Sequence, residues 1–207
     1  DQSFELYKNG LEEIKAAIRP ETTLIYLESP SSLVLYMQDI EEIAKIAKEH
    51  GIGTAIDNTY ATPLHQNPYT YGIDLVCHTA SKYMGGHSDI VAGVVAGSKE
   101  MIEQIAHEER ELLGSCMDPH QAWLLIRGLR TMPLRIKQHA ENARRVAEFL
   151  EKHPKVEKVF YPGSATYDQP ELYEKYLTGQ NGLMSFIPKG SADDAKRLVG
   201  KLHYFQN

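Results

Sequence analysis

Four short apolar runs constrain the fold of this 207-residue chain more than any other feature of its sequence. They cover residues 23–27, 53–56, 73–77 and 90–96. None alternates strictly between apolar and polar positions, which is typical of strands buried on both faces in a parallel sheet. Apolar residues at helical spacing in segment 39–51 separate the first two runs, so a right-handed crossover is expected. The predicted fold class is therefore α/β, with a central, mostly parallel sheet flanked by helices.

The pattern changes after the fourth run, and this change predicts a second domain. Residues 133–153 form a long helical pattern with a broad polar face, and strand patterns at 156–161 and 182–187 follow it. We therefore expect a large domain over residues 1–132. A linking helix and an incomplete, smaller α/β domain are expected over residues 133–207.

Composition excludes several classes of protein. Hydrophobic residues make up 42% and charged residues 24% of the chain, which is typical of a folded globular protein rather than a disordered one. The formal net charge is −6 with both signs mixed along the chain, so neither a nucleic-acid-binding stripe nor a basic membrane patch is expected. No apolar run approaches the roughly 18 to 20 residues of a membrane span.

The cysteines and histidines give no sign of a disulfide or a metal site. Cys77 and Cys116 lie far apart without a CxxC motif, and His78 and His87 lack metal-ligand spacing. We therefore expect no metal, and a reducing cytoplasm is the simplest location for the protein.

An aspartate and a lysine lie at the ends of two neighbouring predicted strands. Asp57 ends one strand, and Lys82 follows the next one. A lysine amine can form a Schiff base with an aldehyde, and a carboxylate can keep a pyridine nitrogen protonated. The hydroxyls of Thr79 and Ser81 flank the lysine and could donate hydrogen bonds to a phosphate. These residues predict a site for pyridoxal 5'-phosphate, with Lys82 as the catalytic residue and with four cofactor-binding residues: Lys82, Asp57, Thr79 and Ser81.

Four blocks of sequence make a resemblance to a known family specific. They are Glu28-Ser29-Pro30, the run DNTYATP at 57–63, the run TASKYMGGHSD at 79–89 and the run RGLRT at 127–131. In this order they resemble the Cys/Met-metabolism family of fold-type I pyridoxal-phosphate enzymes, which includes cystathionine β-lyase, cystathionine γ-synthase and methionine γ-lyase. The resemblance extends over nearly the whole chain, and the block around Lys82 is its most diagnostic part.

The resemblance implies a role for each candidate residue. Lys82 matches the lysine that carries the cofactor and later moves protons, and Asp57 matches the carboxylate that pairs with the pyridine nitrogen. Thr79 and Ser81 match the hydroxyl pair that helps to bind the phosphate. The implied activity is that of a carbon–sulfur lyase acting on a small sulfur amino acid, in a homotetramer built from dimers that share active sites.

The run after Pro30 favours one member of the family. Many members have an asparagine near position 32, whereas Ser31-Ser32-Leu33 is closer to the variant of some bacterial cystathionine β-lyases. A γ-replacement enzyme of the same family, such as cystathionine γ-synthase or O-acylhomoserine sulfhydrylase, is the first alternative. The second alternative, from another class, is a doubly wound α/β module that binds a ligand without catalysis.

Three parts of the family pattern have no counterpart in this sequence. They are an N-terminal tyrosine and arginine pair, a glycine-rich phosphate turn with a ring-stacking tyrosine, and a C-terminal arginine that binds the substrate carboxylate. In addition, no strand precedes the first helical pattern, and a new strand pattern begins just before Asn207. We therefore expect a fragment that lacks both ends of a longer protein and is inactive by itself. Its retention of the cofactor is left open, because much of the phosphate site is missing.

Several residues also have a purely structural interpretation. Thr79 and Ser81 could bond only to local backbone, and Tyr60 could either line the cofactor pocket or pack. Three arginines are interpreted as charge on a helix surface or a subunit interface rather than as an anion site: Arg127, Arg130 and Arg135.

Overall fold

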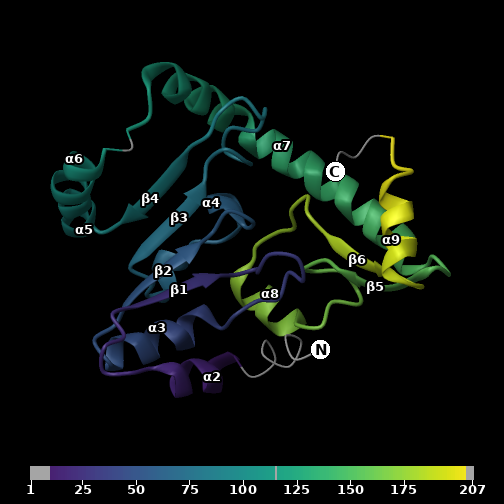
Figure 1. Ribbon diagram of the computed structural model, residues 1–207, viewed down its shortest axis with the longest axis horizontal. Coiled ribbons are helices and arrows are strands. Elements are labelled where there is room, and N and C mark those ends of the chain that lie inside the picture. The colour runs from purple at the N-terminus through teal and green to yellow at the C-terminus, as the bar shows by residue number, and fades with distance from the viewer. Residues whose placement is uncertain (1–9, 115, 204–207) are drawn as a thin grey trace.

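The computed structural model describes residues 10–114 and 116–203, which are built around a four-stranded sheet (Figure 1). Its strands lie side by side in chain order: β1 (Leu24–Glu28), β2 (Gly53–Asp57), β3 (Leu75–Thr79) and β4 (Gly93–Gly97). The pairs β1–β2 and β2–β3 are parallel, and the pair β3–β4 is antiparallel. Helices flank this sheet, so the predicted α/β fold with a mostly parallel sheet is confirmed.

Helix α3 (Ile40–Glu49) makes the crossover between β1 and β2, as the sequence predicted. Asp39 caps it by accepting a hydrogen bond from the N–H of Glu42 at 3.3 Å. Its buried side chains recur at helical spacing: Ile40, Ile43, Ala44, Ile46 and Ala47. The inner face of α3 shares a core with Leu27 and Ile56 of the strands, and α2 (Gly10–Ala17) packs against the same core. This core fixes the helix on one face of the sheet.

Short segments make the remaining connections of the sheet. They are α4 (Thr62–His65) and the 3-10 helix η1 (Pro68–Tyr71) between β2 and β3, and α5 (Lys99–Gln104), the π-helix η2 (Ile105–Glu109) and α6 (Arg110–Leu113) after β4. The fourth predicted run, 90–96, forms a strand only from Gly93 onward. The reason is that the Ser81 hydroxyl, rather than a strand partner, accepts the N–H of Ala92 at 2.9 Å.

Helix α7 (Pro119–Glu151) is one continuous helix of 33 residues. The sequence predicted a helix that begins at Pro133, but this proline lies inside α7. A proline removes one backbone hydrogen bond from a helix. Buried Met132 and Ile136, on either side of it, pack into the same core as Leu125, so tertiary contacts carry the helix across the proline. The division into domains 1–132 and 133–207 stays a prediction, and its boundary falls within a helix.

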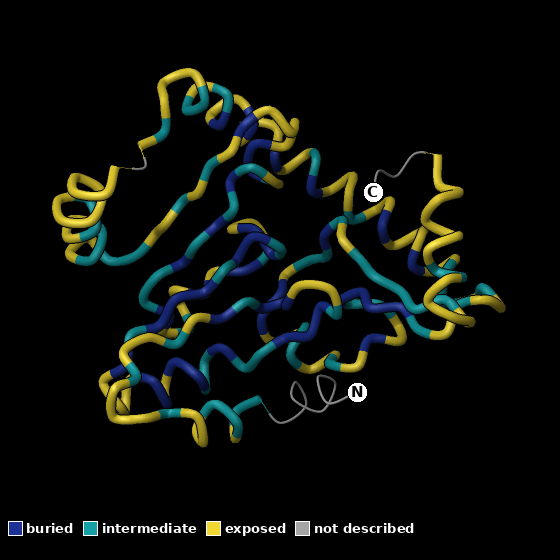
Figure 2. The backbone as a smooth tube through the Cα atoms, in the orientation of Figure 1, coloured by how far each residue is buried: buried dark blue, intermediate teal, exposed yellow. Residues whose placement is uncertain are grey.

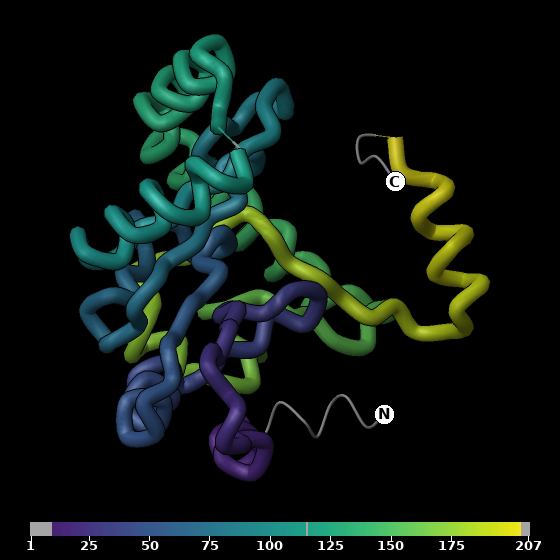
Figure 3. Tube along the Cα trace, turned by 60° about the vertical axis from the view of Figure 1, so that its left-hand side comes forward, coloured from purple at the N-terminus to yellow at the C-terminus, as the bar shows by residue number. Residues whose placement is uncertain are grey.

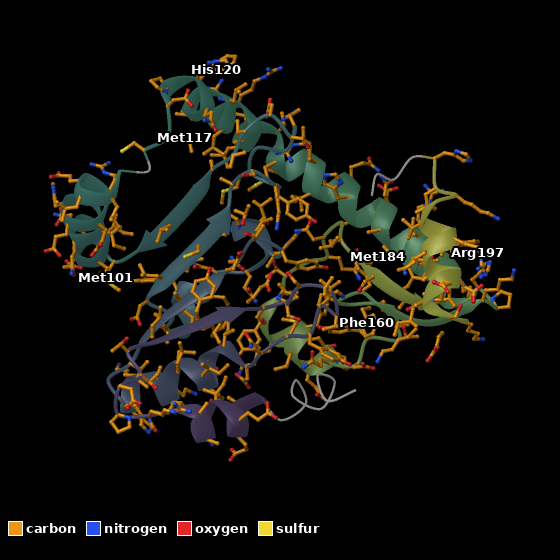
Figure 4. All side chains as sticks on the ribbon, in the orientation of Figure 1. Met101, Met117, His120, Phe160, Met184 and Arg197 are labelled. Atoms are coloured by element: carbon orange, nitrogen blue, oxygen red, sulfur yellow. The ribbon has the colours of Figure 1, made fainter. Side chains whose placement is uncertain are left out.

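The second half of α7 supports a small antiparallel sheet of β5 (Val156–Phe160) and β6 (Ser185–Pro188). Ala147 of the helix is buried with Val159, and Met184 packs against this cluster (Figure 4). Two helices complete this part of the chain: α8 (Pro170–Tyr176) and α9 (Ala192–Val199).

Burial is uneven along the chain. The inner face of α3 and the middle of β2 are buried, whereas β1 and β4 are mostly half-buried or exposed. Helices α5, α6 and α9 are mostly exposed (Figure 2), and α9 stands apart from the remaining elements (Figure 3). Three residues around α8 are buried in the same core as α3 and the sheet: Tyr167, Tyr176 and Leu177. Residues on both sides of the predicted boundary therefore share one hydrophobic core.

Candidate active site

The carboxyl ends of β2 and β3 hold the residues that the sequence singled out. These strands are parallel, so their carboxyl ends meet at the same edge of the sheet. Asp57 ends β2 and is in register with Cys77, and Thr79 ends β3. Ser81 and Lys82 follow in the lysine turn, which we define as residues 80–86. All four predicted residues therefore lie at one edge of the sheet.

The Asp57 carboxylate is held at one oxygen only. Its Oδ1 accepts the N–H of Thr59 at 2.8 Å, and the hydroxyl of buried Thr59 accepts the N–H of Thr79 at 2.7 Å. Thr59 thus ties the carboxylate of β2 to the end of β3. Within the described residues, Asp57 Oδ2 has no hydrogen bond and the carboxylate has no ion pair, so this oxygen can meet a further donor.

The neighbours of Asp57 on β3 are neutral near pH 7. Burial lowers the pKa of the His78 imidazole, although the Asp57 charge and a hydrogen bond with the Asn58 backbone oppose this shift. Burial also raises the pKa of the Cys77 thiol, with a hydrogen bond from Tyr26 opposing it. A cationic donor would therefore meet no competing positive charge from these two side chains.

The lysine turn fixes the backbone of Lys82 and leaves its amine available. The N–H of Lys82 donates to Thr79 O at 3.3 Å, and Lys82 O accepts the N–H of Gly86 at 2.7 Å. A third hydrogen bond, from the N–H of Gly85 to Ala80 O at 2.8 Å, closes the turn. The Lys82 side chain is exposed, and in the described part of the chain its amine has neither a hydrogen bond nor an ion pair.

The two hydroxyls beside the lysine differ in how far they are already engaged. No hydrogen bond of the Thr79 hydroxyl is found among residues 10–114 and 116–203. The Ser81 hydroxyl accepts the N–H of Ala92 at 2.9 Å and donates to Ala92 O at 3.3 Å. Thr79 can therefore donate to a phosphate directly, whereas Ser81 would first have to release Ala92 O.

Comparison with known proteins decides the family. Residues 5–207 match the family described as Cys/Met metabolism PLP-dependent enzyme. The chain belongs to this family. Its predicted membership is therefore confirmed, and so are pyridoxal 5'-phosphate as the family's cofactor and the enzyme class.

Curated relatives that match the chain carry several different enzyme names. The chain is 42% identical to an L-methionine gamma-lyase of Porphyromonas gingivalis, over 93% of this chain and 49% of that protein. It is 41% identical to a cystathionine beta-lyase of Lactococcus lactis, over 95% of this chain and 52% of the relative. A probable cystathionine gamma-synthase of Herpetosiphon aurantiacus is 40% identical, over 92% of this chain and 60% of its own length. The chain thus spans about half the length of most curated relatives it matches.

The groups at this edge of the sheet fit the cofactor of the Cys/Met metabolism family. Pyridoxal phosphate presents an aldehyde, a pyridine nitrogen and a phosphate. In the described ranges, the Lys82 amine and the Asp57 Oδ2 atom have no hydrogen-bond or ion-pair partner. The Thr79 hydroxyl is a further hydrogen-bond donor. Three of the four predicted residues therefore suit the group directly, and Ser81 suits it after a local change.

The sequence left the role of Tyr60 open, and the structure places it against a distant segment. Its hydroxyl donates to Leu183 O at 3.2 Å, and its carbonyl accepts a short hydrogen bond from the Asn181 amide. Burial raises the pKa of Tyr60 well above its ordinary value, so the phenol stays protonated. These contacts join positions more than a hundred residues apart, so no local pattern could have indicated them.

Arg135 makes a contact with the lysine turn that the sequence interpretation did not foresee. It was interpreted as charge on a helix surface or an interface, but it is half-buried and donates hydrogen bonds to backbone carbonyls, including Met84 O in the lysine turn. Arg127 and Arg130 are exposed, in line with the interpretation. The missed contact crosses 51 positions of the sequence.

The described residues contain neither a metal-binding cluster nor a membrane-spanning helix. No group of three or more histidine, cysteine or acidic side chains is arranged to hold a metal ion within these ranges. None of the helices in the described part is both long and apolar enough to cross a membrane.

Proposed function

We propose that this protein is a pyridoxal-phosphate-dependent carbon–sulfur lyase that acts on a small sulfur amino acid, with Lys82 as its catalytic residue. The observation that carries the proposal is the placement of the Asp57 carboxylate and the Lys82 amine at one edge of the sheet. When bound, pyridoxal phosphate supplies an aldehyde to which amines attach and a cationic ring that withdraws electrons from the substrate.

Lys82 has two roles in this proposal. Its Nζ would hold the cofactor, and the same amine, once free, would take the proton from the substrate Cα. A base must lie within hydrogen-bonding reach of the proton it removes. The lysine turn supports both roles, because it anchors the Lys82 backbone at its N–H and its carbonyl while Nζ is exposed.

In this proposal, Asp57 and Thr79 bind the cofactor and orient it. Asp57 Oδ2 holds a proton on the ring nitrogen, because a nearby opposite charge favours the protonated form of a base. The Thr79 hydroxyl donates to the phosphate, and Ser81 adds a second donor if its hydrogen bond to Ala92 O opens.

Within the family we propose β-elimination, as in cystathionine β-lyase. The support is the run Ser31-Ser32-Leu33, in which the N–H and the hydroxyl of Ser32 both donate to the Glu28 carboxylate, at 3.1 and 2.8 Å. The proteins named above have nearly equal identity to this chain, at 42, 41 and 40%. The choice of elimination at Cβ therefore rests on this run.

The experiment is a product assay on the protein at its full natural length, loaded with pyridoxal phosphate. Cystathionine, cysteine and methionine are supplied in turn, and 2-oxo acids are identified by mass spectrometry. Elimination at Cβ of cystathionine yields homocysteine, pyruvate and ammonia, and this is the expected result, abolished in Lys82→Ala. The appearance of 2-oxobutanoate would instead indicate elimination at Cγ. Absence of any oxo acid from all three substrates would overturn the proposal. Conversion of an activated homoserine with a thiol would then indicate the γ-replacement alternative.

We further propose that the protein forms a homotetramer in a reducing compartment such as the cytoplasm. Large apolar side chains are exposed along α7, with Trp123 at 58%, Leu134 at 74% and Phe149 at 63%, and such surface usually becomes buried in an assembly. Cys77 and Cys116 are both unpaired, which is usual where thiols stay reduced. Light scattering on the full-length protein should give the mass of four copies, and a monodisperse monomer would contradict the assembly.

A further inference from the structure

We infer that Arg135 is a positioning residue that sets the backbone of the lysine turn, and through it the reactivity of Lys82. This inference deepens the proposed function and rests on it. Arg135 lies on α7, 53 positions (135 − 82) after the lysine in the chain, and it contacts the turn rather than the cofactor-binding groups. Its effect on Lys82 is therefore indirect.

The first observation is that α7 lies directly on the lysine turn. A Cβ atom at position 128 would lie 2.3 Å from Gly85 O and 2.5 Å from Met84 O, which is closer than real side chains approach backbone. Gly128 is thus the residue that lets the two backbones meet. The turn and the helix are packed without side chains between them at this point.

The second observation is the fork of hydrogen bonds from the Arg135 guanidinium. Its Nη2 donates to Gly128 O at 2.9 Å and, over a longer 3.4 Å, to Met84 O. Its Nε donates to the Thr131 hydroxyl at 3.0 Å, which orients the planar group. The guanidinium therefore bridges the helix and the lysine turn.

The third observation connects the guanidinium with Lys82. Gly86 adopts a positive φ of 78°, and a Cβ atom there would lie 2.2 Å from Arg135 Cζ, so the backbone of Gly86 rests on the guanidinium. The N–H of the same Gly86 donates to Lys82 O at 2.7 Å. The backbone of Lys82 is therefore one hydrogen bond away from a residue that contacts Arg135.

The chemistry of the contact requires an arginine. Burial lowers the pKa of Arg135, and in the described ranges its guanidinium bonds to carbonyls and a hydroxyl but to no carboxylate, so the group carries a desolvation cost without an ion pair. A planar fork can reach Gly128 O and the Thr131 hydroxyl together, whereas the point charge of a lysine cannot. The side chain thus positions backbone through hydrogen bonds and does not form an ion pair.

The test compares Arg135→Met and Arg135→Lys with Arg130→Met in the full-length protein. Arg130 lies on the same helix but is exposed, which makes it a matched control. Each protein is incubated with pyridoxal phosphate for short times at a temperature well below its melting point, reduced with borohydride and digested. Mass spectrometry then gives the rate of labelling at Lys82 and, separately, at all other lysines.

The inference predicts that both Arg135 variants label Lys82 about tenfold more slowly than wild type, since a hydrogen bond to a charged group is typically worth that much or more. Labelling of other lysines should not change, and Arg130→Met should match wild type. A lower melting temperature in Arg135→Met with an unchanged Lys82 rate would overturn the inference, because the role would then be only structural.

If Arg135→Met does not fold, the rate in Arg135→Lys decides in the same way. If wild type itself is not labelled at Lys82, the proposed function fails and the inference fails with it. If wild type is labelled and the Arg135 variants are labelled at the same rate, only the inference fails.

Discussion

At the scale of single residues, two threonine hydroxyls each accept a backbone N–H and so tie β2 to β3, one at each end of the strand pair. Near the amino ends, the Thr54 hydroxyl accepts the N–H of Asp74 at 2.9 Å and donates to its carboxylate at 2.8 Å. At the carboxyl ends, the Thr59 hydroxyl accepts the N–H of Thr79 at 2.7 Å. Both threonines are buried. Only the second one also touches the Asp57 carboxylate, through its own N–H.

This pair gives a controlled mutation experiment. Thr59→Val and Thr54→Val each leave a backbone N–H of a half-buried residue without its acceptor, so each should lower the free energy of unfolding by about 1–3 kcal/mol. Only Thr59→Val should also weaken cofactor retention, measured by absorbance after dialysis of the loaded protein, because only this threonine lies beside Asp57 and Thr79. Thr59→Ser keeps the hydroxyl and should retain the cofactor. Equal loss of cofactor from both valine variants would contradict this account.

Residue type and position near strand ends were sufficient to propose Asp57 and Lys82, whereas Thr79 and Ser81 rested mostly on the family resemblance. Asp57 ends one apolar run and Lys82 follows the next, and parallel strands bring such positions to one edge of the sheet, while the roles of all four residues stay predictions. Thr59 and Arg135 could not be predicted, because their contacts depend on which carbonyl or N–H of a distant segment comes within reach. The engagement of Ser81 with Ala92 was foreseen only as a general alternative, since side-chain bonds to local backbone are common for serine.

At the scale of elements, Asp39 links the start of α3 to the end of α8. Its carboxylate caps α3, forms an ion pair with Lys175 at 3.1 Å and accepts a short hydrogen bond from Tyr176. Burial raises the pKa of Asp39, but hydrogen bonds from Tyr176, Lys175 and the N–H of Glu42 outweigh burial and lower it overall. The ionised carboxylate is therefore favoured by folding.

The stability that Asp39 contributes should depend on pH. Because its pKa is lower in the folded chain, this contribution is complete above the ordinary pKa of about 4 and is lost as the pH falls through the folded value. Asn caps helices as well as Asp, so Asp39→Asn tests the charge alone. It should lower the free energy of unfolding at pH 7 by roughly 1.5 kcal/mol, and the difference from wild type should shrink by pH 3 in urea titrations. Exposed Asp193→Asn is the control, and an equal effect of Asp39→Asn at both pH values would refute the interpretation.

The elements themselves were predictable to different degrees. Helix α3 followed from its apolar spacing and from Asp39, because a single local pattern and a cap determine it. The continuity of α7 did not follow, since Pro133 is a helix breaker in isolation and is tolerated here by packing of Met132 and Ile136. The late start of β4 depends on one serine side chain. Local patterns thus indicated where apolar faces occur, and tertiary contacts set where the elements end.

At the scale of the whole molecule, the C-terminal part is joined to the loop between β1 and α3 by a glutamine side chain that bonds to both backbone groups of one residue. The Gln169 amide accepts the N–H of Met37 at 2.7 Å and donates to Met37 O at 2.9 Å. Tyr167 adds a hydrogen bond to Leu35 O at 2.6 Å. With the shared core around α8, these contacts predict that residues on both sides of position 133 unfold together.

Denaturation in urea tests this cooperativity. Tryptophan fluorescence and far-ultraviolet circular dichroism should give one coincident transition. Gln169→Ala should lower the free energy of unfolding by about 2 kcal/mol, because it leaves two backbone groups of buried Met37 without partners. Gln104→Ala, at an exposed helical glutamine, should have little effect. Two separate transitions in wild type would support independent domains instead.

The central claim is that Lys82 carries the cofactor, and borohydride trapping tests it most directly. The full-length protein is incubated with pyridoxal phosphate, reduced and digested, and the adduct is located by mass spectrometry, with Lys82→Ala and exposed Lys99→Ala as paired controls. The account predicts a single adduct at Lys82 that disappears in Lys82→Ala and persists in Lys99→Ala. Label spread over surface lysines, or unchanged in Lys82→Ala, would contradict it.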